Sequence, residues 1–191
     1  MIDLGGMLLN ADKALFIFLN ERLANVVFDW TMPVITNDWF LRVLFVLLIV
    51  ALLIWGKKQG RITAVVCIAT LVATDQVSAH LIKPWVSRVR PCHVIPSVHL
   101  LVNCSQGLSF PSSHAANSFG QAIALSLEYR KQSWIFYLFA SLVSFSRIAV
   151  GVHYPSDVLG GAIIGTLCGL VVVLLERIVN WKIAAPLPIS S

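Results

Sequence analysis

The sequence predicts an all-α protein, a polytopic membrane helical bundle with five or six transmembrane helices. Hydrophobic residues make up 58% of the 191-residue chain and charged residues only 12%, which is too few to cover a soluble globule. Several apolar runs also approach the about 20 residues that a helix needs to cross about 30 Å of hydrocarbon. The length allows one domain of ordinary size, so we expect residues 1–191 to form a single integral-membrane domain.

The N-terminal stretch, residues 1–36, has amphipathic helical spacing. Between residues 15 and 34, apolar side chains recur at helical intervals opposite a polar stripe. That stripe consists of Glu21, Asn25 and Asp29. The helix either spans the bilayer with its polar stripe facing other helices, giving six spans, or lies in the membrane interface, leaving five. We lean toward spanning. Asp3, Asp12 and Lys13 leave no basic leading segment, so no cleaved signal peptide is expected.

Five further segments are candidate spans. The first two are strongly apolar, and the third is more polar. The last contains four glycines, at positions 160, 161, 165 and 169, and such small residues let helices approach closely in lipid. The five segments are Trp39–Gly56, Arg61–Ile82, Ser113–Tyr129, Gln132–Val150 and Pro155–Glu176.

The positions of Lys and Arg predict the orientation. With alternating crossings, seven of these cations share one side, which the positive-inside rule makes cytoplasmic. They are Lys57, Lys58, Arg61, Arg130, Lys131, Arg177 and Lys182. Four others, Lys83, Arg88, Arg90 and Arg147, fall on the opposite side, and ionisable groups at a membrane edge are usually functional. The net charge of +5 comes without a basic stripe or aromatic platform, which argues against nucleic acid as a partner.

Three polar segments meet on the non-cytoplasmic side, and their residue types suit a phosphoryl group. They are residues 83–91, 110–114 and 146–157, so that residues 83–114 form a site loop. Arg presents a planar fork of donors to phosphate oxygens, and Lys adds a compact charge. Ser112 or Ser113 is a candidate N-cap, and Pro155 suits the first residue of a helix. The N–H groups at such helix starts favour an anion.

Two histidines in these segments are candidates for acid–base and nucleophilic chemistry. His153 and Asp157 are four residues apart around a helix start, so the carboxylate can reach the imidazole. A carboxylate that accepts from one ring nitrogen leaves the other as a nucleophile. His114, on a separate helix, can then donate a proton to the leaving oxygen.

These residues resemble the type-2 phosphatidic-acid phosphatase superfamily. The spacing K-x6-R-P at Lys83–Pro91, P-S-S-H at Pro111–His114 and S-R-x5-H-x3-D at Ser146–Asp157 is similar to the three signatures of that family, in order over about 75 residues. Ser113 stands where the second signature usually has glycine. Serine would be strained there if the position needed positive φ; we expect that only its N–H is used.

The resemblance implies a role for each matching residue. Lys83, Arg90 and Arg147 would bind phosphate, assisted by Ser112 and the Ser113 backbone. It further implies that His153 attacks phosphorus, Asp157 orients it and His114 protonates the leaving group. Family members work without a metal or other cofactor, so none is expected, and the sequence offers no cluster with convincing metal spacing.

Several other residues are open to two interpretations. Arg88 is either part of the site or a loop charge that faces lipid headgroups, and Asp75 is expected to pair with a polar group inside the bundle. His80, His93 and His99 are expected to be structural or interfacial. We expect a disulfide between Cys92 and Cys104, which lie 12 residues apart in the non-cytoplasmic loop. Two other cysteines, Cys67 and Cys168, are expected to be packing residues.

The predicted function is metal-independent hydrolysis of a lipid phosphate or lipid diphosphate through a phosphohistidine. The apolar, uncharged loop between Cys92 and Phe110 could hold a lipid chain above the site or simply rest on the bilayer. A lipid phosphotransferase with the same site, or a non-catalytic lipid-binding or transport protein, remains an alternative. The expected partners are a lipid phosphate and membrane lipids, in a bacterial inner membrane with the site facing the periplasm or exterior. The sequence does not indicate an oligomeric state.

Overall fold

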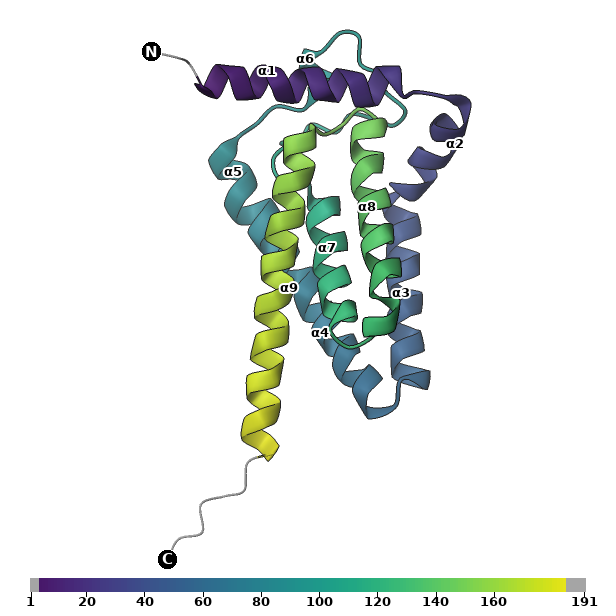
Figure 1. The fold of residues 1–191 in the computed structure, drawn as a ribbon, viewed down its shortest axis with the longest axis vertical. Coiled ribbons are helices and arrows are strands. Elements are labelled where there is room, and N and C mark those ends of the chain that lie inside the picture. Colours follow the sequence, from purple (N-terminus) through teal and green to yellow (C-terminus); the bar gives the residue numbers. More distant parts are fainter. Residues whose placement is uncertain (1–3, 185–191) are drawn as a thin grey trace, which may run out of the picture.

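The computed structural model describes residues 4–184, with side chains for residues 5–180; Asp3 and the Lys182 side chain therefore lie outside the described residues. Within this part of the chain the elements are helices and loops without a strand, which confirms the all-α prediction. The long helices form a bundle, which Figure 1 shows from the side. They are α3 (Asp38–Trp55), α4 (Lys57–Asp75), α7 (Ser113–Ser126), α8 (Ser133–Ala149) and α9 (Pro155–Ala184).

These helices agree with the five candidate spans, although they differ in length. Among the described residues, three stretches are long and apolar enough to cross a bilayer, at Asp38–Trp55, Lys57–Val94 and Pro155–Asn180. The second of these continues α4 through the wider π-helical turns of Gln76–Ile82 into α5 (Lys83–Val86) and ends with α6 (Pro91–Val94). With 14 and 17 residues, α7 and α8 are shorter. The protein is thus an integral membrane protein, and the count of five or six spans stays a prediction.

The central helix is α7, which packs against α4, α8 and α9. Its contact with α9 is close because α9 presents glycines to it. A Cβ at Gly165 would lie 2.0 Å from the Ala116 carbonyl oxygen, and one at Gly161 would lie 2.4 Å from that of Ser112. A larger residue at either position would push α9 away from α7, as expected for small-residue packing in lipid. This contact holds the start of α9 beside the start of α7.

The N-terminal stretch differs from a single amphipathic helix. It is divided into α1 (Leu4–Ile17), a π-helical turn (Phe18–Arg22) and α2 (Val26–Ile35). The chain breaks before Asn25, whose side chain accepts from the Phe28 N–H and caps α2. In Figure 1, α1 lies across one end of the bundle, at a steep angle to α8 and α9. This is the arrangement expected of the interfacial alternative, not of the spanning helix that we favoured.

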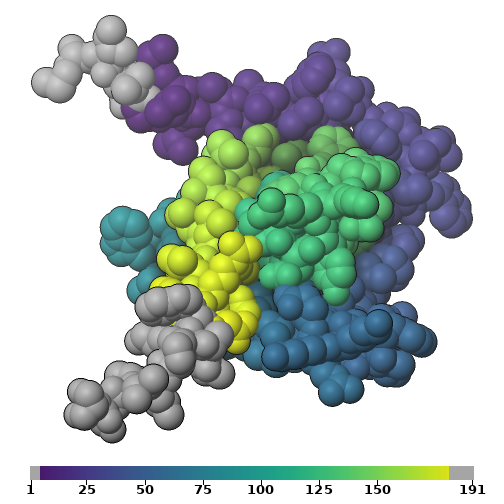
Figure 2. Space-filling model, turned by 60° about the horizontal axis from the view of Figure 1, so that its bottom comes forward, coloured from purple at the N-terminus to yellow at the C-terminus, as the bar shows by residue number. Residues whose placement is uncertain are grey.

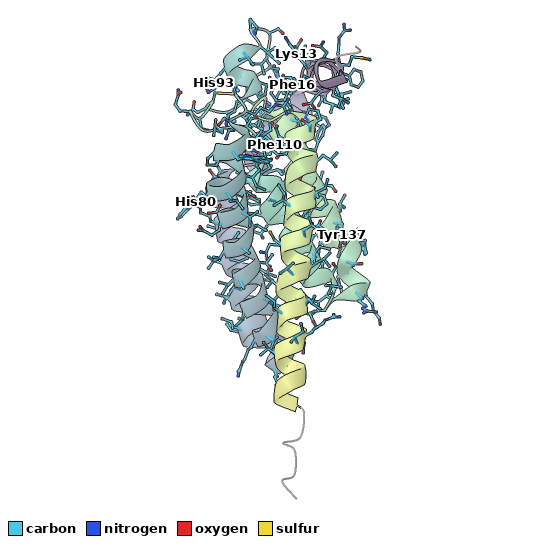
Figure 3. All side chains as sticks on the ribbon, turned by 90° about the vertical axis from the view of Figure 1, so that its left-hand side faces the viewer. Lys13, Phe16, His80, His93, Phe110 and Tyr137 are labelled. Carbon is cyan, nitrogen blue, oxygen red and sulfur yellow. A yellow bond between two sulfur atoms is a disulfide. The ribbon has the colours of Figure 1, made fainter. Side chains whose placement is uncertain are left out.

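Asn20 attaches this N-terminal stretch to the bundle. Its buried side-chain amide donates to the carbonyl oxygens of His99 at 2.9 Å and Ala149 at 2.9 Å, and its oxygen accepts from the His99 N–H at 2.8 Å. Phe16 is likewise buried and meets the Tyr154 ring edge-on. Figure 3 shows Phe16 beneath α1, near the end of the bundle. One face of α1 is therefore fixed to the protein, whereas its outer face exposes apolar side chains.

The two ends of the bundle have different chemistry. The start of α4 and the α7–α8 connection share one end, where Gln59 donates to Glu128 at 2.6 Å, and together they carry five of the seven cations expected on the cytoplasmic side. Figure 2, turned so that this end comes forward, shows α1 along the far edge. Exposed tryptophans occur near both ends, as in an aromatic belt. These are Trp30, Trp39 and Trp85 near α1, and Trp55 and Trp134 at the opposite end.

Candidate active site

The three polar segments meet at the end of the bundle that α1 crosses. Residues 83–90 leave the α4 stretch there, residues 109–114 lead into α7, and residues 147–157 connect α8 with α9. Two backbone hydrogen bonds join them: the Ser112 N–H donates to the Asp157 carbonyl at 3.0 Å, and the Ser109 N–H donates to the Arg88 carbonyl at 2.7 Å. Segments far apart in the sequence thus form one site.

His153 and Asp157 form a buried pair at the start of α9. The imidazole Nδ1 lies 3.5 Å from the carboxylate Oδ2, and the two residues are 1% and 0% exposed. Since α9 begins at Pro155, as predicted, His153 precedes the helix while Asp157 lies in its first turn. The Oδ2 atom also accepts from the Ser109 hydroxyl at 2.5 Å and from the Tyr154 N–H at 2.8 Å. The carboxylate is therefore held in one orientation.

Arg90 determines which ring nitrogen of His153 carries the proton. Its Nη1 lies 3.3 Å from His153 Nε2, and because a guanidinium only donates, Nε2 must accept. The proton then resides on Nδ1, which faces Asp157 and lies 3.5 Å from the Ser109 hydroxyl. Arg90 is itself held by donation from Nε to the Gly107 carbonyl at 2.9 Å. The Nε2 lone pair thus points at a cation, where a phosphate would be held.

The protonation state of His153 suits a nucleophile. Burial lowers the pKa of the imidazole well below its usual value, and the nearby Arg147 and Arg90 lower it further, while the Asp157 carboxylate opposes them. The imidazole is consequently neutral near pH 7, with its lone pair available. Neutral imidazole is the form that can attack an electrophile.

Lys83 and Arg147 add two more cations to the site. The Lys83 ammonium donates to the Ser113 hydroxyl at 3.0 Å, which leaves donor capacity for an anion. Arg147 donates from Nη1 to the Thr36 hydroxyl at 2.5 Å, and its buried Nε has no hydrogen-bond partner among the described residues. Buried donors in proteins are almost always paired. An unpaired guanidinium N–H beside His153 is therefore a candidate phosphate donor.

The start of α7 is built from Ser112 and Ser113. Ser112 is buried and caps the helix, with its hydroxyl accepting from the Ala115 N–H at 3.5 Å, as expected for an N-cap. Ser113 is the first residue of α7, and positive φ among the described non-glycine residues occurs only at Lys57 and Ser87. The replacement of glycine by Ser113 therefore causes no backbone strain. Whether these two residues contact phosphate stays a prediction.

His114 lies on the open side of the site, against the connection between α2 and α3. Its Nε2 is 3.1 Å from the Asp38 carboxylate and 3.2 Å from the Thr36 carbonyl oxygen. The Asp38 side chain is 71% exposed, whereas that of His114 is 17% exposed. His114 is thus a second histidine with a carboxylate partner, supplied by a different helix.

A cavity of about 780 Å³ begins beside His114 and runs between α3, α4, α7 and α8. Its polar end includes Ser113, His114 and Asp38. Most of the other lining side chains are apolar, among them Leu41, Leu44, Phe45, Leu48, Leu71, Val72, Ile135, Phe136 and Phe139. An apolar cavity with a polar end suits a molecule that carries both a charged group and a hydrocarbon chain.

Sequence reasoning left Arg88 open and missed several neighbours of the site. Arg88 contacts Asp157 directly, at 2.7 Å. Ser109 lies only two residues before the second signature. This short distance in the sequence was the one signal that could have identified Ser109 as a residue of the site. Three residues from the N-terminal third of the chain also contact the site, and no motif in the sequence indicated them. They are Asp12, Thr36 and Asp38.

One expectation about the polar residues outside the site is wrong. Asp75 makes no hydrogen bond or ion pair within the described part of the chain and instead lines the cavity. The histidines expected to be structural or interfacial lie outside the site. His99 pairs with Asp29 at 2.9 Å, His93 contacts the Ser105 carbonyl at 3.1 Å, and His80 is exposed on the side of the bundle (Figure 3).

The cysteines agree with the predictions. Cys92 and Cys104 form a disulfide that ties α6 to the loop beyond it. The other two are free, with Cys67 buried and Cys168 half-buried within helices. Phe110, at the end of this loop, covers the start of α9, where it contacts Gly160 (Figure 3). The loop between Cys92 and Phe110 therefore covers the end of the bundle.

Known proteins resemble this chain over most of its length. The family model of the PAP2 superfamily matches residues 63–181. The lipid A 4'-phosphatase of Bacteroides thetaiotaomicron is 36% identical over 66% of this chain, and the match spans 60% of that relative's own length. The undecaprenyl-diphosphatase BcrC of Bacillus subtilis is 33% identical over 76% of this chain and 73% of its own.

A solved structure shows the same fold. The crystal structure of Aquifex aeolicus LpxE superposes with a TM-score of 0.72 and 28% sequence identity, and the match covers 84% of this chain and 93% of LpxE. The residues that the family model matches contain all three signatures, together with α7, α8 and most of α4 and α9. The resemblance inferred from Lys83, Arg90, His114, His153 and Asp157 is thereby confirmed, and the chain belongs to the PAP2 superfamily.

Proposed function

We propose that this protein hydrolyses a lipid phosphate or lipid diphosphate at the non-cytoplasmic face of the membrane, through a phosphohistidine on His153. One observation carries the proposal: His153 Nε2 accepts from Arg90 at 3.3 Å while its Nδ1 faces the buried Asp157. This arrangement offers a neutral nucleophile to a phosphate that the same guanidinium would bind. The names of the relatives, a lipid A 4'-phosphatase and an undecaprenyl-diphosphatase, support a lipid substrate.

The proposed first step forms a bond between His153 Nε2 and phosphorus and breaks the bond from phosphorus to the lipid oxygen. The positive charge that develops on the imidazole is stabilised by Asp157 across Nδ1–H. Lys83, Arg90 and Arg147 balance the charge on the phosphoryl oxygens, and Ser112 and the Ser113 N–H are proposed to assist. His114 donates its proton to the departing oxygen.

The second step returns the protein to its starting state. Water attacks the phosphorus of the phosphohistidine, and His114, now neutral, accepts a proton from it. The bond between Nε2 and phosphorus breaks, and inorganic phosphate leaves. The cavity that His114 lines supports this step, because water must reach the proton acceptor.

The cavity beside His114 supports a lipid as the substrate. Its polar end adjoins Ser113, and its apolar walls continue between α3, α4, α7 and α8 toward the membrane interior. A phosphate at the cations would leave the hydrocarbon chain in this space. Suitable substrates by this chemistry are phosphatidic acid, phosphatidylglycerol phosphate, undecaprenyl diphosphate and the phosphate of lipid A.

The test offers these four lipids to purified protein in detergent and measures inorganic phosphate. We expect release from at least one of them, abolished by His153→Ala, unaffected by a metal chelator and inhibited by orthovanadate. Release of a phosphorylated acceptor in place of inorganic phosphate would identify a phosphotransferase instead. The proposal is wrong if a folded wild-type protein releases no phosphate from any of them, or if His153→Ala retains full activity.

The proposed orientation has support from the charges at the two ends. The cations at the start of α4 and in the α7–α8 connection lie at the end opposite His153. The positive-inside rule requires such cations of a cytoplasmic face. We therefore propose a bacterial inner membrane, with the site facing the periplasm or exterior. In spheroplasts, a membrane-impermeant maleimide should modify a cysteine introduced at exposed Ser105 but not one at exposed Lys131. The reverse labelling pattern would contradict this orientation.

A further inference from the structure

Arg88 and Asp12 form an ion-pair network on the side of Asp157 that faces away from His153. Arg88 donates from Nη1 to Asp157 Oδ1 at 2.7 Å and from Nη2 to Asp12 Oδ2 at 2.6 Å. The guanidinium also lies 3.9 Å above the Tyr154 ring. The side chains of Arg88, Asp12 and Asp157 are 18%, 11% and 0% exposed, so solvent screens these charges only weakly. The network therefore differs from an ordinary surface ion pair.

Asp12 connects α1 to the start of the helix that carries Asp157. Its Oδ1 accepts from the Ser156 N–H at 2.9 Å, and its Oδ2 accepts from the Ser156 hydroxyl at 2.5 Å. The Ser156 N–H is one of the first amides of α9, which have no partner within the helix. Asp12 thus caps α9 from a segment 144 residues away, and its charge favours the positive end of the helix.

Arg88 is occupied in a way that distinguishes it from Arg147, one of the proposed phosphate ligands. Its Nη1 donates both to Ser156 at 2.6 Å and to Asp157, and its Nη2 donates to Asp12. Both terminal nitrogens therefore bind protein oxygens, in contrast to Arg147, whose Nε has no partner among the described atoms. Arg88 is thus directed at the carboxylate and not at the position of a phosphate.

We propose that Arg88 and Asp12 are positioning residues for the His153–Asp157 pair, so that docking of the surface helix α1 sets the rate of the chemical step. The proposal rests on the function proposed above. Arg88 holds Oδ1 of Asp157, and this leaves Oδ2 to Ser109, the Tyr154 N–H and the imidazole. Asp12 holds Arg88 and Ser156 in turn. Groups that orient the ligands of a metal site change activity by about 10- to 100-fold when they are removed, and we expect an effect of similar size for groups that orient Asp157.

The test compares four variants with the wild type on a lipid phosphate that the wild type hydrolyses. They are Arg88→Gln, Asp12→Asn, the double variant and Lys13→Gln. Lys13 is the matched control, because it neighbours Asp12 on α1, is exposed and lies outside the network (Figure 3). We measure kcat and KM in detergent, and thermal unfolding of each variant.

For Arg88→Gln we expect kcat to fall by about 10- to 100-fold with KM within about threefold, since the carboxylate moves while the phosphate ligands stay. Asp12→Asn keeps the shape of the side chain and is expected to lower kcat by about three- to tenfold. The double variant should lose less than the product of the two single losses, because part of the effect of Asp12 passes through Arg88. Lys13→Gln should match the wild type.

Three results would overturn the proposal. The first is a kcat for Arg88→Gln and Asp12→Asn equal to that of Lys13→Gln. The second is a change confined to KM, which would make Arg88 a substrate ligand. The third is multiplied losses in the double variant. If Arg88→Gln does not fold, the comparison of Asp12→Asn with Lys13→Gln decides alone. A wild type that releases no phosphate refutes the proposed function and this inference together, whereas an active wild type with unaffected variants refutes this inference only.

Discussion

The site contains two histidine–carboxylate pairs that differ in their surroundings. In the pair of His153 and Asp157 both residues are buried, and the carboxylate accepts from three further donors. In the pair of His114 and Asp38 the carboxylate is 71% exposed and His114 lines a cavity. The first pair comes from adjacent turns at one helix start, whereas the second joins two helices. We call His153 with Asp157 the sealed pair and His114 with Asp38 the open pair.

This difference matches the two tasks that the proposed reaction separates. A nucleophile has to keep one tautomer and one direction, and burial with a fixed carboxylate provides both. A residue that exchanges protons with a leaving group and then with water must stay accessible to both. The sealed pair is therefore suited to attack, and the open pair to proton transfer.

The largest effects are expected at the sealed pair. His153→Ala should lower phosphate release by at least about 10⁴-fold, because the nucleophile is removed, and Asp157→Asn by about 10²- to 10⁴-fold, because the positive charge that develops on the imidazole loses its carboxylate partner. Both are measured as inorganic phosphate released from a lipid phosphate, with unfolding temperatures as the control for folding. A folded His153→Ala protein with more than a hundredth of the wild-type rate would show that the sealed pair is not the nucleophile.

The open pair should show a loss that depends on the leaving group. Replacing His114 by alanine is expected to lower the rate on a lipid phosphate by about 10²- to 10⁴-fold, because the departing alkoxide lacks a proton donor. An aryl phosphate with an acidic phenol needs no such proton, so its first step should be nearly normal and labelled phosphoenzyme should accumulate. Equal losses in the rate of phosphoenzyme formation on both substrates would refute proton donation by His114.

The sequence predicted the sealed pair better than the open one, for a physical reason. His153 and Asp157 lie within one turn, so their spacing alone brings them together. Contacts of His114 with Asp38 and of Arg88 with Asp12 span 76 residues in each case and depend on how separate helices pack. Periodicity within a segment holds no information about such pairings.

The fold shows the same division between local and long-range information. Apolar runs predicted the five long helices, since membrane-facing segments must be continuous and hydrophobic. They did not predict that the N-terminal stretch breaks near Asn25 and turns α1 across the bundle. That turn depends on the buried amide of Asn20, which binds the loop and the end of α8. Such a contact is visible only once the bundle has formed.

A pH-dependent stability is expected from the burial of His153. Its pKa in the folded protein is lowered below the ordinary value of 6.5. As the pH falls through 6.5, the unfolded chain therefore gains the proton first, so the stabilisation is present above that pH and is lost below it. The free energy of unfolding should fall by up to about 1.4 kcal/mol per pH unit.

Thermal unfolding in detergent at pH 7 and pH 5 measures this loss, and His153→Asn, which cannot titrate, should reduce it. Both proteins carry the same remaining ionisable groups, so the difference between their slopes isolates the imidazole. Identical slopes would mean that the imidazole of the folded protein takes up protons as it does in water, and the pair would then not be sealed.

The smallest effect is expected at the carboxylate of the open pair. Asp38→Asn should lower kcat by no more than about fivefold, because exposed ion pairs contribute about 0–1 kcal/mol. The same isosteric change at Asp157 serves as the matched comparison, since it removes one carboxylate charge beside a histidine in the same site. A loss at Asp38 as large as that at Asp157 would mean that exposure does not distinguish the two pairs. His114 would then need its carboxylate as strictly as His153 does, and the division of tasks between a sealed and an open pair would fail.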